Sequence, residues 1–545
     1  MPVKNTSQVY DFIVIGSGFG GSVSAMRLAE KGYTVLVLER GKRFNDEDLP
    51  KTNWDLRKYL WLPALRCFGI LQMSLSRGYF VYHSSGVGGG SLVYSAVLME
   101  PNEAFFNSQS WNYQADWKQV LRPHYETVRN MLGVNTNPKL WPADDALCEV
   151  ARELGFQDTF RPTEVGIFFG EPGEEVPDPY FGGAGPSRSG CTHCGNCVVS
   201  CRENAKNSLD KNYLFFAEEL GAEIFSESQA SAIYPLTEGQ DDGARYEIHY
   251  HSSTTWGNKS TEVVRARSVV LSAGVLGTLA LLLRCRDEIR SLPNLSNRLG
   301  KMVRTNSEAF LGAFSRSGED DHSQGLSITS IFHADEVTQI EPVRFSNGST
   351  MLIRSLSSPL IEATGGFFSR LWSSFVEVLK DPLAFIDQKL IPGLARRGLI
   401  LMVMQSEDNQ MKLSLGRNPF ALFRRGLVGE HDREHTIPVN IALGHRVVRS
   451  FAEKIHGDPS GSITEGLLDL PMTAHIMGGC SFGRTPQEGV IDLDCQVHNY
   501  PGLYVIDGSI MPANPGVNPT LTITALAEYA MSRMPNNNGQ QINTP

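Results

Sequence analysis

The segment 191–201 reads CTHCGNCVVSC and places four cysteines within eleven residues. Its spacing, C-x2-C-x2-C-x3-C, is typical of loops that wrap an iron–sulfur cluster. Zinc also binds four thiolates, although its sites usually come as two separated pairs. A third alternative is a packed loop of free or oxidised thiols. The spacing favours an iron–sulfur cluster over zinc, and the candidate ligands are Cys191, Cys194, Cys197 and Cys201.

A second chemical pattern lies near the N-terminus. An apolar strand runs into Gly16-x-Gly18-x-x-Gly21, a helix rich in Ala and Leu follows, and a second strand ends on Glu39. The glycines allow a tight turn and a close approach of the backbone to a pyrophosphate, and the acid can bind ribose hydroxyls. The helix N-terminus offers free N–H groups to the phosphates. The order of these elements predicts dinucleotide binding without separating NAD from FAD.

The composition is that of an ordinary globular protein. The chain has 545 residues, 41% hydrophobic content and a net charge of −10. Because no basic stripe is visible, we expect no nucleic-acid partner. The N-terminus lacks a secretory signal pattern, and the longest uncharged run, Ser268–Leu283, is too short to span a bilayer. We therefore expect a cytoplasmic protein, in which cysteines stay mostly reduced.

Four further segments carry a resemblance to a known family. They read GVGGGSLVY (86–94), VVLSAGVLGT (269–278), HIMGGC (475–480) and LYVIDGSIMPANPGVNPTLTITALAE (503–528). Together they resemble the glucose–methanol–choline (GMC) flavin oxidoreductases, and within them the cholesterol-oxidase-like branch. With the N-terminal loop, the resemblance runs from residue 10 to about residue 533. Some members of that branch also carry a Cys-rich segment before a stretch similar to Ala205–Leu209.

The resemblance implies an α/β fold with FAD as the cofactor. A Rossmann-like FAD-binding domain would be formed by residues 1–100, 202–310 and 465–535. A substrate-binding domain with a mixed sheet would be inserted as residues 101–201 and 311–464, and residues 536–545 would form a polar tail. The implied FAD contacts are Gly16, Gly18, Gly21, Glu39, Gly86, Gly88, Gly90, Ser91, Ala273, Gly274, Asp507, Gly508 and Thr520.

The implied chemistry is oxidation of an alcohol. The flavin takes a hydride from the carbinol carbon, and the protein must remove the hydroxyl proton. By resemblance, His475 accepts that proton and Asn518 binds the substrate oxygen, because imidazole titrates near neutrality and an amide does not compete for the proton. An isomerase glutamate of the branch is matched here by Ala395, so double-bond migration is not expected. Glu308, Glu407 and Asp408 could supply a carboxylate, but we expect them to form ion pairs at strand ends.

Two apolar stretches, Trp54–Leu75 and Phe367–Ile386, bear on the substrate. The apolar positions of the second fall on one face of a helix. That helix could face the core, or it could form a lid or an interfacial surface with peripheral membrane contact. The pattern is compatible with a bulky apolar alcohol, such as a sterol or terpenoid.

The fate of the electrons separates the remaining hypotheses. A cluster in the Cys-rich loop would relay them to a redox carrier and make the protein a dehydrogenase, whereas without one dioxygen would be the acceptor. Two other function classes stay open: a flavin-dependent lyase or decarboxylase of the same family, and a redox-sensing flavoprotein without catalytic activity.

Overall fold

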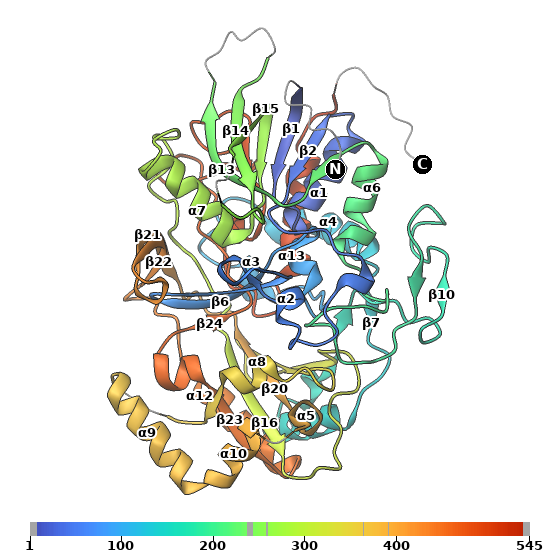
Figure 1. The fold of residues 1–545 in the computed structure, drawn as a ribbon, viewed down its shortest axis with the longest axis vertical. Coiled ribbons are helices and arrows are strands. Elements are labelled where there is room, and N and C mark those ends of the chain that lie inside the picture. Colours follow the sequence, from blue (N-terminus) through green and yellow to red (C-terminus); the bar gives the residue numbers. More distant parts are fainter. Residues whose placement is uncertain (1–7, 237–242, 258–259, 363–364, 391, 538–545) are drawn as a thin grey trace.

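The computed structural model describes all residues except 1–7, 237–242, 258–259, 363–364, 391 and 538–545. Two large sheets organise the chain, one above the other in Figure 1. Most of the predicted polar tail lies outside the described residues; Asn537 still donates to the carbonyls of Lys31 and Gly32. In the described part of the chain, no helix combines the length and apolar character needed to cross a bilayer.

The upper sheet is the predicted Rossmann-like unit. Its strand order is β12-β2-β1-β15-β14-β13, with β25 paired to β15. The strands around β1 are parallel, and β13 and β14 form an antiparallel extension. The bounds are β1 Val9–Ile15, β2 Val35–Leu38, β12 Glu223–Phe225, β13 Ser228–Pro235, β14 Tyr246–Ser252, β15 Glu262–Leu271 and β25 Leu503–Val505. The apolar runs of β1 and β2 are buried, as expected for central parallel strands.

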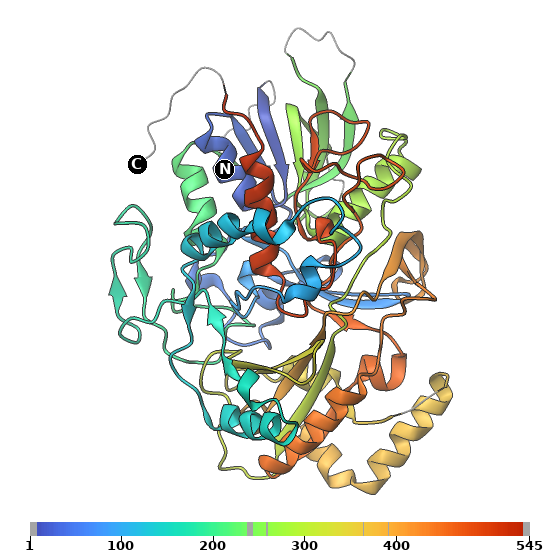
Figure 2. The same cartoon turned by 180° about the vertical axis from the view of Figure 1, so that it is seen from behind.

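Helices from distant parts of the chain cover this sheet (Figures 1 and 2). Helix α1 packs against α6 and α13, and α13 packs against α4. The bounds are α1 Phe19–Glu30, α4 Trp117–Met131, α6 Tyr213–Glu219, α7 Gly274–Asp287 and α13 Thr520–Ser532. Because Trp117, Leu121 and Val128 of α4 are buried in the core of the upper sheet, α4 belongs with the FAD-binding unit by its packing. This packing differs from the predicted division, which placed residues 101–201 in the substrate domain.

The lower sheet has the order β19-β23-β16-β20-β18-β17-β8. It was expected to be mixed, but each pairing between its described neighbours is antiparallel. The bounds are β8 Arg161–Pro162, β16 Ala309–Ser315, β17 Ser330–His333, β18 Thr338–Val343, β19 Ser357–Pro359, β20 Gly398–Gln405 and β23 Gly457–Ser462. Among the described strands of this sheet, only β17 and β18 are both paired and consecutive in the chain, and helices α8–α11 (residues 351–397) lie between β18 and β20.

The lower sheet separates two apolar layers. Leu401 and Val403 of β20 pack with α12 (Ala442–Lys454) and α5 (Pro142–Glu153), whereas Ile400 and Met402 point to the opposite side. This alternation follows from the two-residue period of a strand. The continuous apolar sequence GLILMVMQ of β20 therefore reflects burial on both faces.

Smaller elements join the two sheets. They include the three-stranded sheet of β5, β6 and β24 and the hairpin of β21 and β22. Their bounds are β5 Leu71–Ser76, β6 Tyr79–Ser84, β24 Met472–Thr473, β21 Met411–Asn418 and β22 Arg424–His431. The remaining helices are α2 Leu56–Tyr59, α3 Glu103–Phe106, α8 Met351–Leu356, α9 Phe367–Lys380, α10 Pro382–Leu390 and α11 Leu394–Arg397.

Candidate active site

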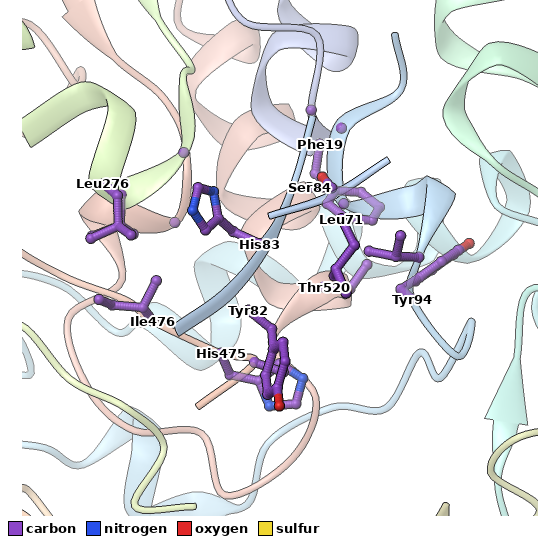
Figure 3. A pocket seen from close by; sticks show the side chains of 18 of the residues that line it. Phe19, Leu71, Tyr82, His83, Ser84, Tyr94, Leu276, His475, Ile476 and Thr520 are labelled. Atoms are coloured by element: carbon purple, nitrogen blue, oxygen red, sulfur yellow. The ribbon is translucent and has the colours of Figure 1, made fainter. Parts of the chain in front are cut away.

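A cavity of about 470 Å³ lies where the two sheets meet (Figure 3). One part is lined by the glycine-rich loop after β1, the end of β2 and the starts of α7 and α13. The other part is lined by apolar side chains of the lower sheet and of α8. His475 and Asn518 line the same cavity. A polar, backbone-lined groove thus continues into an apolar chamber.

The groove is built by glycines that let distant backbones approach each other. Gly16 has φ +101°, and a Cβ there would lie 2.2 Å from Ser272 O. A Cβ on Gly20 would lie 1.8 Å from Ile506 O. A Cβ on Gly18 would instead meet nothing within 4 Å of the protein, and Gly18 lines the cavity. This open space at the N-terminus of α1 fits a pyrophosphate.

Glu39 binds three loops around the groove. Its Oε2 accepts hydrogen bonds from Ser17 N at 3.1 Å and Ser17 Oγ at 2.8 Å. Its Oε1 accepts from Gly41 N at 2.7 Å and Gly86 N at 3.3 Å. The carboxyl group also lines the cavity, and each of its two oxygens already accepts two hydrogen bonds from the protein. Glu39 therefore holds the groove together as well as lining it.

Asp507 fixes the opposite wall. Its Oδ2 accepts from Thr278 Oγ1 of α7 at 2.6 Å, and its Oδ1 accepts from Ser509 N and Oγ. Burial raises the pKa of this carboxyl, while these hydrogen bonds oppose the rise. The contact holds the first turn of α7 beside the cavity. The open space at Gly18, the helix N-termini and the acid Glu39 in the cavity wall together fit FAD.

The predicted cofactor residues fall into two groups, and their contacts with FAD stay predictions. Those that line the cavity are Gly16, Gly18, Glu39, Gly90, Ala273, Gly274, Asp507, Gly508 and Thr520. The others lie behind the lining: Gly21, Gly86, Gly88 and Ser91. Ser91, for example, donates to Gly88 O at 2.7 Å and accepts from Leu209 N at 3.0 Å, so it stabilises the loop.

His475 is held by a buried glutamate. Its Nδ1 contacts Glu308 Oε1, and Glu308 Oε2 accepts from Ala474 N at 2.8 Å. The Glu308 side chain is fully buried, at the start of β16. A carboxylate at Nδ1 selects the tautomer that carries its proton there, which leaves Nε2 as the basic nitrogen. Glu308 was expected to form an ion pair at a strand end, but its partner is the candidate base itself.

A second buried glutamate, Glu341 of β18, holds Asn518. With the Asn518 amide oriented to satisfy both groups, Nδ2 donates to Glu341 Oε1 at 2.9 Å. Burial raises the pKa of Glu341 to about 8, and the negative charge of Glu308 adds to the rise. The site thus holds two carboxyl groups in different environments, one against an imidazole and one against an amide. Only Glu308 faces a group that becomes a cation when it takes up a proton, namely the imidazole of His475.

Another histidine, His83 of β6, lines the cavity apart from His475 (Figure 3). Its Nε2 lies 2.8 Å from Ser74 Oγ. Burial and the nearby Arg40 lower its pKa to about 3. His83 therefore stays neutral and is a poor proton acceptor, so His475 is the better candidate base.

The apolar chamber is continuous with these groups. Its side chains come from α2, β5, β6, the loop after the second glycine segment, the lower sheet and α8. They are Tyr59, Leu71, Tyr82, Val93, Val97, Val198, Phe310, Ile328, Val343, Phe345, Leu352, Ile353, Leu356, Ile400 and Met402. Side chains of this kind favour an apolar ligand over a highly polar one.

Three residues considered from the sequence do not reach the cavity. Ala395 is buried in α11 among core side chains and is absent from the lining, so it bears on no substrate chemistry. Asp408 pairs with the buried Arg304, as expected. The backbone carbonyl of Glu407 accepts from Asn514 Nδ2. The carboxyl groups of the site are Glu308 and Glu341 instead.

The four cysteines of the predicted metal site lie close to one another. Cys191, Cys194, Cys197 and Cys201 line one small cavity of about 20 Å³. Yet within the part of the chain that the structure describes, no three cysteine, histidine or acidic side chains gather as a metal-binding group. Burial raises the pKa of Cys197 to about 11 and raises that of Cys191 further, so without a bound metal these thiols stay protonated at neutral pH. The binding of an iron–sulfur cluster or zinc by this loop stays a prediction.

The loop has a clear structural role. Val198 lines the apolar chamber, and its N–H donates to Ser327 Oγ at 3.1 Å. Lys206 donates to the carbonyls of Leu92, Tyr94 and Cys197, each close to 3 Å. The Cys-rich loop is therefore fastened between the second glycine segment and the lower sheet, as a wall of the substrate chamber.

Sequence reasoning missed Glu341 and Gly20. Glu341 lies in the fully buried strand TQIEPV, between Ile340 and Pro342, and an acid between apolar residues was the available signal. Gly20 lies between the fingerprint glycines, and only its tertiary contact with Ile506 shows why no side chain fits there.

Comparison with known proteins agrees with this architecture. Family models described as GMC oxidoreductase match residues 186–285 and 446–527, and an NAD(P)-binding Rossmann-like domain matches residues 14–45. A cholesterol oxidase from Acinetobacter baumannii is 41% identical over 96% of this chain and 94% of its own length. A cholesterol oxidase from Mycobacterium tuberculosis is 42% identical over 97% of this chain and 91% of its own length. The chain belongs to the GMC oxidoreductase family, and it is an FAD-dependent oxidoreductase.

Solved structures show the same fold at low identity. Pyridoxine 4-oxidase from Mesorbium loti, at 14% identity, covers 96% of this chain and 99% of its own with a TM-score of 0.59. A fungal aryl-alcohol oxidase, at 12% identity, covers 96% of this chain and 98% of its own with a TM-score of 0.56. These likenesses support the arrangement of the two sheets.

Gly18→Ala and Gly20→Ala form a matched pair that tests the groove. The Gly18 methyl meets no protein atom but enters the pyrophosphate space, so we expect an intact fold and FAD affinity weaker by about tenfold or more. The Gly20 methyl collides with Ile506 O, and we expect a loss of about 1–3 kcal/mol in unfolding free energy. Flavin fluorescence titration and denaturant unfolding measure the two effects. Unchanged FAD affinity in Gly18→Ala would contradict the assignment.

Glu341→Gln tests the buried carboxyl. The folded-state pKa of about 8 lies above the ordinary value of 4.5, so the neutral group stabilises the fold fully below about pH 4.5, and this contribution is lost as pH rises toward 8. The unfolding free energy of the wild type should therefore fall relative to Glu341→Gln by up to about 1.4 kcal/mol per pH unit in that window. Urea unfolding of both proteins with excess FAD measures the difference, and parallel profiles would refute it.

Proposed function

We propose that this protein oxidises the hydroxyl group of a sterol or a similarly bulky apolar alcohol, with FAD as hydride acceptor and dioxygen as final electron acceptor. The observation that carries the proposal is the continuity of the apolar chamber with the glycine-lined groove, with His475 and Asn518 in the same lining. The relatives named as cholesterol oxidases, at 41% and 42% identity over nearly the full chain, support a sterol.

The proton is handled by His475. When the hydroxyl of the substrate donates to Nε2, its proton moves to the imidazole while the carbinol carbon loses a hydride. Glu308, in contact with Nδ1, holds the ring and stabilises the imidazolium that forms. Bound FAD supplies the hydride acceptor, and the products are a ketone and a reduced cofactor.

The substrate oxygen is oriented by Asn518. Because one N–H of its amide is held by Glu341, the carbonyl and the second N–H stay in a fixed direction. The negative charge of Glu308 already disfavours a developing alkoxide. Because Glu341 is neutral, it adds no second negative charge beside that alkoxide. The two glutamates thus divide the work: one stabilises a positive charge, and the other fixes an amide.

Dioxygen is the proposed acceptor because the arrangement of the Cys-rich loop suits a chamber wall better than an electron relay. Two electrons and two protons would then leave as hydrogen peroxide. The test is anaerobic mixing with a sterol, followed by air. We expect the flavin to bleach and then to yield one peroxide per ketone. Bleaching without peroxide would make the protein a dehydrogenase, and no bleaching by any apolar alcohol would favour a lyase or a sensor.

His475→Gln tests the base. Glutamine keeps much of the size but cannot take the proton, so we expect the rate of flavin reduction by the sterol to fall by roughly 10²–10⁴-fold. Stopped-flow absorbance measures the rate, and flavin content shows that the cofactor is retained. As a positioning residue, Glu308 should affect the same rate in Glu308→Gln while leaving the sterol dissociation constant nearly unchanged. A wild-type rate in His475→Gln would exclude it as the base.

A further inference from the structure

Helix α9 exposes its apolar face to solvent. Phe368 is 82% exposed and Trp372 is 67% exposed, and they recur at the spacing of one helix face. The outward apolar side chains of this helix are Phe368, Leu371, Trp372, Phe375 and Leu379. A core-facing helix was one alternative from the sequence, and the structure excludes it for this face.

The face of α9 that packs on the protein is polar. Arg370 donates to Glu465 O at 2.9 Å and to Asp469 Oδ1 at 2.5 Å. Ser374, one turn further on the same side, is buried. The helix therefore inverts the usual arrangement of a surface helix, in which the apolar stripe faces the core.

Helix α10 continues the inversion. Leu383 is 76% exposed, and Ile386 and Leu390 are also exposed at helical spacing. Lys389 points inward and donates to the carbonyls of Arg354 and Ser357, both at 2.6 Å. We define the α9–α10 surface as Phe368, Leu371, Trp372, Phe375, Leu379, Leu383, Ile386 and Leu390. Figures 1 and 2 show the two helices as a V at the end of the molecule far from the upper sheet.

This surface is attached to the wall of the substrate chamber. Lys389 holds the end of α8, whose Leu352, Ile353 and Leu356 line the cavity. Helix α9 also packs on β19, the strand that follows α8. The wall of the chamber is thus linked through α8 to two helices that expose aromatic and aliphatic side chains. Large exposed apolar surfaces mark sites of association.

We propose that the α9–α10 surface inserts into the surface of a lipid bilayer and that the alcohol passes from the bilayer into the chamber beside α8. The second half of this inference rests on the proposed function, since a sterol resides in bilayers. Nearby charges are engaged within the protein: Arg370 by Asp469, and Lys380 by Glu377. The chain has a net charge of −10, so apolar insertion rather than attraction to anionic lipid drives the contact.

Vesicle sedimentation tests the surface directly. We expect the full-length holoprotein to bind phosphatidylcholine vesicles, and Trp372→Ser with Phe375→Ser to lower the partition coefficient by about tenfold or more. The matched control is Tyr113→Ser, which removes an exposed ring (55%) outside the α9–α10 surface and should bind as the wild type does. Added phosphatidylserine should change binding by less than about twofold. Far-UV circular dichroism and flavin absorbance verify folding.

Quenching by bromine-labelled phosphatidylcholine locates the insertion. Trp372→Phe keeps the apolar ring but removes the indole, so vesicle binding should persist while most of the quenching is lost. Quenching that persists in Trp372→Phe would place the insertion elsewhere and overturn the proposal. Absence of vesicle binding by the wild type would overturn it as well. If sedimentation velocity shows the wild type as a dimer and the double serine variant as a monomer, a second copy of the chain covers the surface instead, and the proposal is overturned.

Activity separates this inference from the proposed function. The double serine variant should oxidise sterol delivered by cyclodextrin at the wild-type rate, and vesicle-borne sterol more slowly by about tenfold or more, in line with its lost binding. Equal rates in both assays would refute the passage beside α8. If no sterol is oxidised in either form, the proposed function fails, whereas the binding and quenching results still decide whether the surface meets lipid.

Discussion

The close approach of backbones at Gly16 and Gly20 is the constraint on which the rest of the structure depends. Ser272 and Ile506, more than two hundred residues away in sequence, press their carbonyls against these glycines, and Glu39 binds the amides of two further loops. No side chain fits between these segments. The groove, the starts of α1 and α7, and the position of Asp507 all follow from this contact.

The chemistry of the site rests on two buried carboxyl groups with different partners. Glu308 contacts the imidazole of His475, which gains a positive charge in the proposed proton transfer and would be stabilised by the negative charge of Glu308. Glu341 contacts an amide, and burial favours its neutral form. A second anion beside the first would destabilise the alkoxide that develops on the substrate. In the proposed mechanism, this difference in environment lets one residue type perform two functions in the same site.

The substrate chamber depends on the lower sheet being buried on both faces. One face of β20 packs on α12, and the other faces the chamber, which the Cys-rich loop and α8 close at their sides. The four cysteines were the most conspicuous chemical pattern of the sequence, yet their loop contributes Val198 to a wall. A loop that closes an apolar chamber must be held in place by hydrogen bonds. Lys206 holds this loop by donating to the carbonyl of Cys197.

The sequence by itself determined the Rossmann-like unit, the FAD-dependent family and the candidate pair His475 and Asn518, because these depend on local motifs with fixed spacing. Only the tertiary structure decided which carboxyl groups meet that pair, since Glu308 directly precedes β16, Glu341 lies in β18, and neither belongs to a motif. It also decided that α9 turns its polar face inward, which periodicity cannot show because the same stripe serves a core or a surface. The orientation of a helix is set by what packs on it. Here Glu465 and Asp469 bind Arg370, and the aromatic face is left outward.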